Sequence, residues 1–391
     1  MLDTELIVNR EALEGLTAEW DALAAVNALP LMSPAWIMAW WAHLAPATAR
    51  PRVVVAREAG TIVGLAPFFC EPDTRLGRLE YRIPGISVGR APLALPGREW
   101  EVAQAIGSAL AEADPPPDAI VLEATPLVSY WHLSLRECWP GSSRPLAYQY
   151  RVRWCPTVSL AADSYEDWLK QKSAHFRERM RRARRKFAAA GGSVRLSTRE
   201  TLSDDIATLI RLHGGRWHDR GGSEFLTRGG DRLASMLEQA GIALVDDGRF
   251  RLIILEVEGQ PISAQLATGA GGEVLGIIGG WDERFARMSP QVLGILATIE
   301  DALERGDERL NMSVGQQAYK QRIADGIEPV VWSVVVPTGR RLPLTAAGLG
   351  LMLAGKAARD TARRALSPKQ TGRLPGAGRG AGRADPRDPV A

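Results

Sequence analysis

The sequence has 391 residues, more than one domain usually holds, and its 46% hydrophobic and 24% charged residues are typical of a soluble globular protein. A net charge of +3 does not indicate a nucleic-acid partner, and no DNA partner is expected. The three cysteines, Cys70, Cys138 and Cys155, are widely spaced and form no disulfide framework. No run of apolar residues is long enough to span a membrane, and the N-terminus lacks the apolar segment of a signal peptide. We therefore expect a cytoplasmic protein.

The first half of the chain predicts helices, a hairpin, a helix and a strand. Apolar residues recur at helical spacing between positions 10 and 26. Ser33 is a favourable cap for a second helix, rich in Trp, and we expect its aromatic stripe to lie in the core. A hairpin over 52–69, a helix over 100–113 and a strand over 119–123 follow.

The second half repeats this order. Residues 251–268 form a second hairpin pattern, which aligns without a gap on residues 52–69. A helix that begins at Ser289 and a strand that begins at Arg309 then correspond to the last helix and strand of the first half. Two copies of one unit are the best account of this order, and the alternative is a chance match of two hairpins.

A strongly basic helix is predicted between Tyr165 and Gly192. Its apolar residues fall on one face, and its cations are Arg177, Arg179, Arg181, Arg182, Arg184, Arg185 and Lys186. Repulsion among these cations indicates an anionic partner, such as nucleotide phosphates, RNA or a phospholipid surface. A solvated basic face is an equally good interpretation, and base stacking is not indicated because no aromatic residue interleaves with the cations.

The helix that begins at Ser289 is the chemically most informative element. It follows an apolar strand over 273–279, and a short buried strand over 309–312 comes after it. We expect the first amides of the helix to lack partners inside it, at the positive end of the helix dipole. The amides concerned are those of Gln291, Val292 and Leu293. Such a helix start can bind a phosphate, and an ordinary capped helix is the alternative.

Other sequence patterns do not define a site. His218 beside Asp219 could be an acid/base pair, but neighbours in sequence do not face each other on a helix, so a surface loop is the better interpretation. The sequence contains no P-loop, no nucleophile elbow and no glycine-rich dinucleotide-binding turn. No cluster of His, Cys and carboxylates has the spacing of metal ligands, so no metal is expected.

One further pattern joins these elements. It combines the basic helix with W-D-x-x-F-x-x-x-S-P and G-x-x-x-Y-K, and its residues are Phe176, Arg177, Arg181, Arg182, Ala183, Phe285, Ser289, Pro290, Gly315, Tyr319 and Lys320. In this the chain resembles GNAT-superfamily acyltransferases of the BioF2-like type, which include CelD-like proteins of cellulose biosynthesis and are relatives of the FemAB peptidyltransferases. The resemblance covers residues 2–336 and is clear over 168–324.

The resemblance implies an α/β fold with mixed sheets, built as a tandem pair of GNAT-like folds. Residues 1–150 would form a first domain without a cofactor, and residues 151–340 a GNAT domain that carries the cofactor site. Beyond them we expect a helix over 341–366, which packs on the domain or touches an anionic membrane surface. The Gly/Pro/Arg-rich tail over 367–391 should be disordered.

The resemblance also implies that acetyl-CoA or another acyl-CoA is the co-substrate. In GNAT proteins two diverging strands hold the pantetheine arm, and the start of the next helix holds the pyrophosphate. These places fall on Ile277, Ile278, Gly279, Arg287, Ser289, Gln291, Val292 and Leu293.

Further residues are candidates for the chemistry and for charge recognition. Asp282 and Tyr319 are candidates for proton transfer, and a loop-capping carboxylate is the alternative for Asp282. Lys320 would bind a phosphate or a substrate carboxylate, with a surface lysine as the alternative, and Arg177 and Arg181 would contact phosphates.

Three functions remain open from the sequence. The first is transfer of an acyl group, most simply acetyl, from acyl-CoA to an amine or hydroxyl of a sugar, a polysaccharide precursor or an amino compound. The second is a Fem-like transferase that uses aminoacyl-tRNA, in which the basic helix contacts RNA. The third is a non-catalytic scaffold in envelope polysaccharide biosynthesis. In each catalytic case the small-molecule or saccharide acceptor should bind in the cleft between the two copies.

Overall fold

The computed structural model describes residues 2–72, 78–218, 226, 229–315, 317–338, 342–343, 345–348 and 350, without the side chains of 216–218. Residues Met1–Ala346 form one compact unit. Most of the predicted helix over 341–366, the whole tail over 367–391 and the side-chain pair His218–Asp219 lie outside the described residues. No helix among the described residues is long and apolar enough to cross a bilayer.

The first half of the chain begins with a strand and ends with a long one. Its elements are β1 (Asp3–Ile7), α1 (Thr17–Val26), α2 (Pro34–His43), β2 (Arg50–Glu58), β3 (Thr61–Pro72), β4 (Leu79–Arg82), β5 (Leu93–Ala94), α3 (Glu99–Glu112), β6 (Ala119–Pro126), α4 (Trp131–Glu137) and β7 (Leu146–Ser159). The short 3₁₀ turns are η1 (Glu11–Leu16), η2 (Pro30–Met32) and η3 (Leu127–Ser129).

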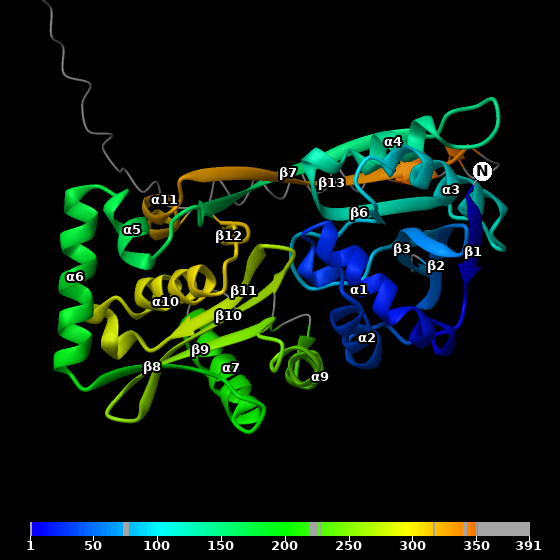
Figure 1. Cartoon of the computed structure of the whole chain (residues 1–391). Coiled ribbons are helices and arrows are strands. Elements are labelled where there is room, and N and C mark those ends of the chain that lie inside the picture. The colour runs from blue at the N-terminus through cyan, green and yellow to red at the C-terminus, as the bar shows by residue number, and fades with distance from the viewer. Residues whose placement is uncertain are drawn as a thin grey trace, which may run out of the picture. The chain divides into compact units, whose positions relative to one another are not determined.

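The second half adds two helices and then repeats this order (Figure 1). The added helices are α5 (Tyr165–Lys170) and α6 (Ala174–Ala189). The repeated elements are β8 (Gly192–Leu196), α7 (Leu202–His218), α9 (Arg232–Leu244), β9 (Phe250–Val257), β10 (Gln260–Ala270), β11 (Glu273–Trp281), η4 (Glu283–Met288), α10 (Pro290–Glu304), β12 (Arg309–Asn311), α11 (Ala318–Ile323) and β13 (Gly326–Val336). The predicted tandem α/β arrangement is confirmed.

The sheet shows the same symmetry, because its strand order reads alike from both ends. The order is β1-β2-β3-β4-β6-β13-β7-β12-β11-β10-β9-β8. The last strands of the two halves are exchanged: β13 pairs with β6 of the first half, and β7 pairs with β12 of the second. Figure 1 shows β7 and β13 as two long strands that run side by side along both halves. The predicted boundary between residues 150 and 151 falls inside β7 and stays a prediction.

The two predicted hairpins close in the same way. In the first, Glu58 pairs with Thr61 across Ala59 and Gly60, which have φ of 49° and 87°. The turn between β9 and β10 likewise has two residues with positive φ, at 50° and 77°. Two-residue turns of this kind match the right-handed twist of the strands that they join. The hairpin match that the sequence indicated is therefore also a match of backbone conformation.

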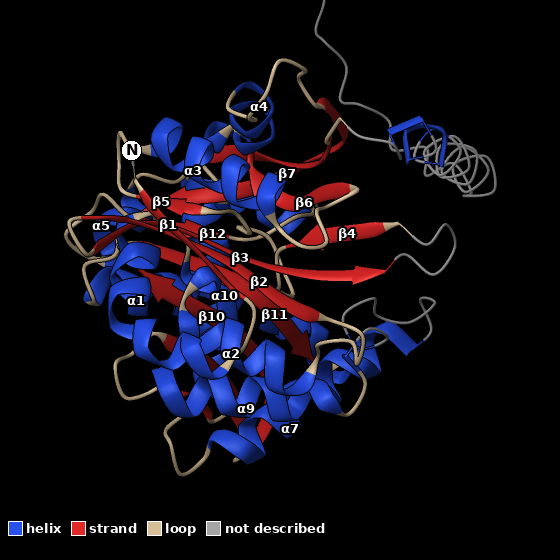
Figure 2. Cartoon of the chain, turned by 90° about the vertical axis from the view of Figure 1, so that its right-hand side faces the viewer, coloured by secondary structure: helices blue, strands red, loops and turns tan. Residues whose placement is uncertain are grey.

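Helices from both halves form a shared layer against the sheet. In Figure 2, α1, α2, α7 and α9 gather at the bottom, away from α3 and α4. The Trp-rich helix α2 lies in the core as predicted, and Trp36 stacks on Phe250 of β9 with ring centroids 5.8 Å apart. The Trp36 Nε1 also donates a hydrogen bond to Thr268 Oγ1 at 3.1 Å. These contacts fix the two halves against each other within the compact unit.

Candidate functional site

The first feature of the site is a pair of parallel strands that separate. β11 pairs with β12 over three residue pairs, from Glu273 and Arg309 to Leu275 and Asn311. Beyond this point β11 continues to Trp281 beside β10, whereas β12 has ended. Beyond Leu275 the β12-facing edge of β11 therefore has no neighbouring strand among the described residues.

A β-bulge changes the direction of β11 along this edge. Gly276 pairs with Ala267 and Ile278 with Leu266, so Ile277 is the extra residue. Bulges of this kind redirect a strand and often lie next to active sites. The structure thus places the predicted residues Ile277, Ile278 and Gly279 together on the separating edge of the strand.

Two glycines of β11 leave room for close neighbours: Gly279 for the side chain of Gln265 on β10, and Gly280 for the backbone of α7. A Cβ at Gly279 would lie 2.1 Å from the Oε1 of Gln265, and a Cβ at Gly280 would lie 2.3 Å from the backbone nitrogen of His213 on α7. The His213 ring also hydrogen-bonds the Gly279 carbonyl at 2.9 Å. The contacts of Gln265 and His213 with β11 were not predicted from the sequence. The only signals for them were a Gln within an apolar strand and the two consecutive glycines of β11.

The start of α10 differs from its prediction in one respect. Ser289 caps the helix with a left-handed backbone (φ 58°), and its side chain makes no capping hydrogen bond. Its carbonyl accepts hydrogen bonds from the amides of Val292 (3.0 Å) and Leu293 (3.1 Å). The expectation that these two amides lack partners inside the helix is therefore wrong. The helix start contacts β10, because Gln291 Nε2 donates to Gln265 Oε1 at 3.3 Å, and the Gln265 side chain in turn lies against Gly279 of β11.

The basic helix α6 packs beside the start of α10. Ala183 and Phe187 share a hydrophobic cluster with Met288 and Leu293. On one side of this contact, Arg184 pairs with Glu300 farther along α10 (2.7 Å).

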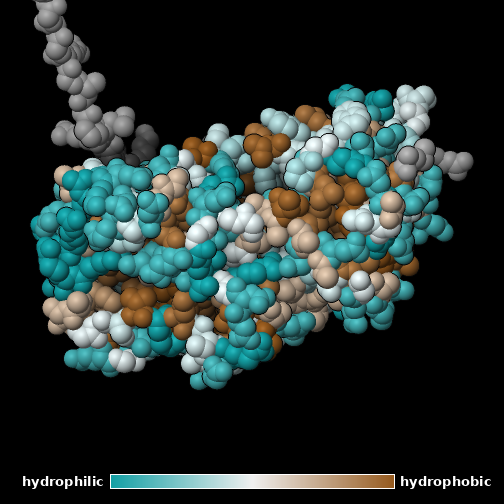
Figure 3. Space-filling view, in the orientation of Figure 1, coloured by the Kyte–Doolittle hydropathy of each residue, from teal (hydrophilic) through white to brown (hydrophobic). Residues whose placement is uncertain are grey.

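Three cations lie on the side of α6 opposite Arg184, because the α-helix turns about 100° per residue. Arg179, Arg182 and Lys186 form this basic flank, in which Arg179 is half-buried and Arg182 lies 3.8 Å from Glu178 of the same helix. Arg179 and Lys186 make no ion pair with any residue that the structure describes, and Arg287 of η4 is exposed nearby. Hydrophilic residues cover this edge of the molecule (Figure 3).

The two arginines of α6 that were predicted to bind phosphate have other partners. Arg177 Nη1 donates hydrogen bonds to the carbonyls of Lys170 (3.1 Å) and Lys172 (2.6 Å). Arg181 lies 3.5 Å from Glu166. Arg177 therefore holds the junction between α5 and α6, and phosphate contacts of Arg177 and Arg181 stay predictions.

Asp282 has the capping role that was the alternative in the sequence analysis. Its carboxylate accepts a hydrogen bond from the Arg284 amide at 3.0 Å, and it pairs with the Arg284 guanidinium at 2.6 Å. These bonds to Arg284 lower the pKa of Asp282. The capping interaction is thus present, and a role of Asp282 in proton transfer stays a prediction.

Lys320 is buried, and its ammonium faces backbone carbonyls and not a phosphate. Its ammonium donates hydrogen bonds to the carbonyls of Met312, Ser313 and Val314, the residues that follow β12. It thereby fixes the chain where β12 leaves β11, and both earlier interpretations, a phosphate-binding or a surface lysine, are wrong. Tyr319, its neighbour on α11, is half-buried against the cluster around α10.

The buried ammonium predicts a pH dependence of stability. Burial lowers the pKa of Lys320 to about 8, from 10.5. Between these values the unfolded chain binds more protons than the folded chain, so titration of Lys320 should raise the free energy of unfolding by about 2 kcal/mol from pH 8 to pH 10. Urea unfolding at pH 8 and pH 10 measures this rise. It should be absent in Lys320→Met and present in Lys170→Met, and an equal rise in both variants would contradict the assignment.

Comparison with known proteins agrees with this geometry. Residues 174–321 match the family model described as an acetyltransferase (GNAT) domain. A search of the curated proteins finds no match. The crystal structure of FemX superposes with a TM-score of 0.60 at 14% identity, covering 87% of this chain and 98% of FemX.

Two other structures span both halves. A conserved protein of unknown function from Bacteroides thetaiotaomicron has a TM-score of 0.53 at 12% identity, covering 86% of this chain and all of that one. A tandem GNAT protein from the clavulanic acid biosynthesis pathway has a TM-score of 0.45 at 12% identity, with the same coverage. The match of residues 174–321 and the FemX superposition show a GNAT-type fold similar to that of FemX, and the BioF2-like and CelD-like labels stay predictions.

Proposed function

We propose that the chain is an acyltransferase of the BioF2-like type, which transfers an acyl group from an acyl-CoA thioester to an amine or hydroxyl of a small acceptor. The observation that carries the proposal is the separation of β11 from β12 after Leu275, within the region that matches the GNAT model. The bulge at Ile277 and the adjacent start of α10 support it. The acceptor could be a sugar, a polysaccharide precursor or an amino compound.

In this proposal the chemistry is a direct transfer. The acceptor nitrogen or oxygen bonds to the thioester carbonyl carbon, the carbon–sulfur bond breaks, and the proton lost by the acceptor ends on the leaving sulfur. The backbone N–H groups on the free edge of β11 would stabilise the negative charge on the carbonyl oxygen. The protein otherwise contributes positioning, and Tyr319 remains our candidate for proton transfer to sulfur.

The basic flank gives the proposal a measurable consequence. Simultaneous replacement of Arg179, Arg182 and Lys186 by Ala should weaken acetyl-CoA binding by about 10-fold, because exposed cations beside the start of α10 attract the phosphates of the co-substrate. Isothermal titration calorimetry on the full chain measures the dissociation constant. The difference should shrink at 0.5 M salt, where exposed charges are screened.

A matched triple variant provides the control. Lys170→Ala, Arg199→Ala and Arg305→Ala remove three other exposed cations of the second half, which pair with acids outside the basic flank. Acetyl-CoA should bind this variant as tightly as the wild type. If no acyl-CoA produces heat or a thermal shift with the wild type, the acyl-CoA proposal fails.

Aminoacyl-tRNA-dependent transfer is the second candidate, favoured by the same basic flank. RNA presents a series of phosphates, and the exposed arginines of α6 suit them. A tRNA would then bind with an affinity that falls steeply with salt, and the flank variant would lose that binding. Tight tRNA binding without acyl-CoA binding would favour this candidate over the first.

A further inference from the structure

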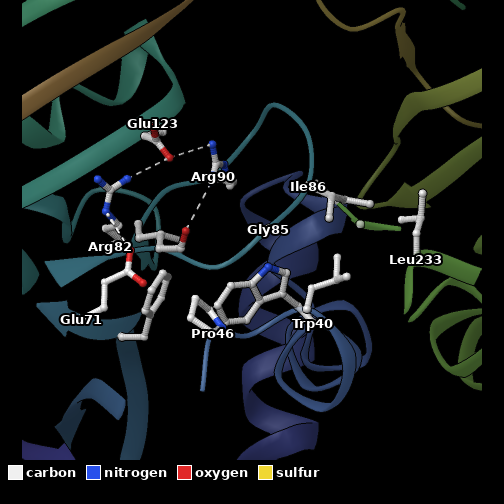
Figure 4. Close-up of a pocket in the computed structure, with 13 residues that line it drawn as sticks. Trp40, Pro46, Glu71, Arg82, Gly85, Ile86, Arg90, Glu123 and Leu233 are labelled. Carbon is white, nitrogen blue, oxygen red and sulfur yellow. Dashed lines mark hydrogen bonds and ion pairs between the residues drawn. The ribbon is translucent and has the colours of Figure 1, made fainter. Parts of the chain in front are cut away.

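A cavity of about 290 Å³ lies where the two halves meet. It opens between α2, the strands β3, β4 and β6, and the start of α9 (Figure 4). The volume is at the lower end for small-molecule sites, which are mostly apolar pockets with a few converging polar groups. This cavity has both parts: one charged wall and one apolar wall.

The charged wall alternates in sign across three neighbouring strands. Glu71 of β3 lies 3.5 Å from Arg82 of β4, and Arg82 lies 3.6 Å from Glu123 of β6. Arg90, from the loop after β4, lies 3.4 Å from the same Glu123. Figure 4 shows the arginines and Glu123 side by side at the rim of the cavity. The wall therefore presents carboxylates and guanidiniums in alternation.

The wall is held in place from behind. Glu80, which is 3% exposed, pairs with Arg82 and with the buried Arg78, so the Arg82 guanidinium has a fixed position. The Thr125 hydroxyl donates a hydrogen bond to the Arg90 carbonyl at 2.8 Å, which anchors the loop. Groups that are fixed before a ligand arrives bind it with a smaller loss of entropy.

The apolar wall is equally rigid. Trp40 contacts Phe69 with ring centroids 4.9 Å apart, and Trp41 contacts the same ring edge-on at 6.0 Å. Pro46, Ile86 and Leu233 complete this side (Figure 4).

We infer that this cavity binds the α-ammonium and carboxylate groups of a free amino acid. A purely anionic ligand would face the carboxylates of Glu71 and Glu123, and a purely cationic ligand would face the guanidiniums. A ligand with both charges a few ångströms apart can pair its ammonium with a glutamate and its carboxylate with an arginine. Charge-assisted hydrogen bonds of this kind are about twice as strong as neutral ones.

The position of the cavity sets a second requirement for its ligand, and this requirement rests on the proposed function. The loop that carries Ile86 and Arg90 also carries Ser87, whose hydroxyl lies 3.3 Å from that of Ser313. Ser313 follows β12 directly and is one of the residues whose carbonyl Lys320 holds. One loop thus connects the cavity to the gap between β11 and β12. We therefore orient a bound amino acid with its α-ammonium and carboxylate on the charged wall and its side chain toward this loop.

Calorimetry tests the inference by measuring how tightly L-lysine and L-ornithine bind to the full chain in the absence of acyl-CoA. Both should bind at least 10-fold more tightly than cadaverine, which lacks the carboxylate, and than 6-aminohexanoate, which lacks the α-amine. Glu71→Gln and Glu123→Gln keep the shape of the wall and should each weaken L-lysine binding by about 10-fold. Thermal unfolding verifies that both variants remain folded.

Glu58→Gln is the matched control, because Glu58 pairs with Arg98 in the same half, outside the cavity. It should bind L-lysine like the wild type. Any one of three results would overturn the inference. Glucosamine could bind more tightly than L-lysine, neither amino acid could bind, or both cavity variants could bind L-lysine like the wild type. These titrations contain no acyl-CoA. A failure of acetyl-CoA to bind would therefore not affect the amino-acid result, and a failure of L-lysine to bind would not affect the acetyl-CoA result.

Discussion

Replacing Lys320 by methionine should lower the rate of acyl transfer about 100-fold. The substitution keeps the length of the side chain but removes the donor for the carbonyls of Met312, Ser313 and Val314. The segment after β12 would then shift to find other partners, since hydrogen bonds to a charged group contribute about 1.5–3 kcal/mol each. Misplacing a reacting group by about 1 Å is enough for a 100-fold loss.

The measurement is a steady-state assay with acetyl-CoA and the best acceptor of the binding tests. Lys320→Arg retains donors and should recover part of the activity. Lys170→Met, an exposed lysine on the neighbouring α5, should behave as the wild type. Full activity in Lys320→Met would show that the geometry of the gap between β11 and β12 does not depend on the hydrogen bonds of Lys320.

Replacing Gly271 by alanine should reduce the free energy of unfolding by about 3–5 kcal/mol. Gly271 lies in the turn between β10 and β11 with φ of 58°, and a Cβ there would lie 1.8 Å from the backbone carbonyl oxygen of Ala25. The contact cannot be relieved by moving a side chain, because the atoms that the Cβ would meet belong to the backbone of α1, which is held by the buried Trp20 and Leu23. The loss adds a backbone clash to the strain of a left-handed alanine.

Gly259 separates these two effects. It also has positive φ (77°), but a Cβ there would meet nothing within 4 Å. Gly259→Ala should therefore cost only about 1–2 kcal/mol, the strain alone. Urea unfolding of both variants measures the difference. Equal losses would show that the contact between α1 and the turn contributes nothing to stability.

The sequence predicted the fold well because its evidence was local. Hairpins, caps and helical periodicity are properties of neighbouring residues, and the repeat between residues 52–69 and 251–268 made the tandem arrangement readable. The edge at Ile277–Gly279 was placed correctly on β11 for the same reason, since a strand followed by a capped helix defines it. Its role in binding the donor remains a prediction.

Other features depended on contacts between distant segments. The roles of Lys320 and Arg177 are set by backbone carbonyls that point at them, and no side-chain pattern encodes those directions. Glu71, Arg82 and Glu123 meet only because β3, β4 and β6 are neighbours in the sheet. The amides of Val292 and Leu293 were misjudged because the backbone conformation of Ser289 directs its carbonyl toward both.

The exchange of β7 and β13 has a consequence for synthesis on the ribosome. The edge of β6 receives its partner only when Val330–Val335 has emerged, after nearly all of the second half has been translated. Until then the first half carries an open strand edge, which can pair with other chains. Nascent chains should therefore need protection by chaperones for most of translation, and a fragment that stops before β13 should aggregate.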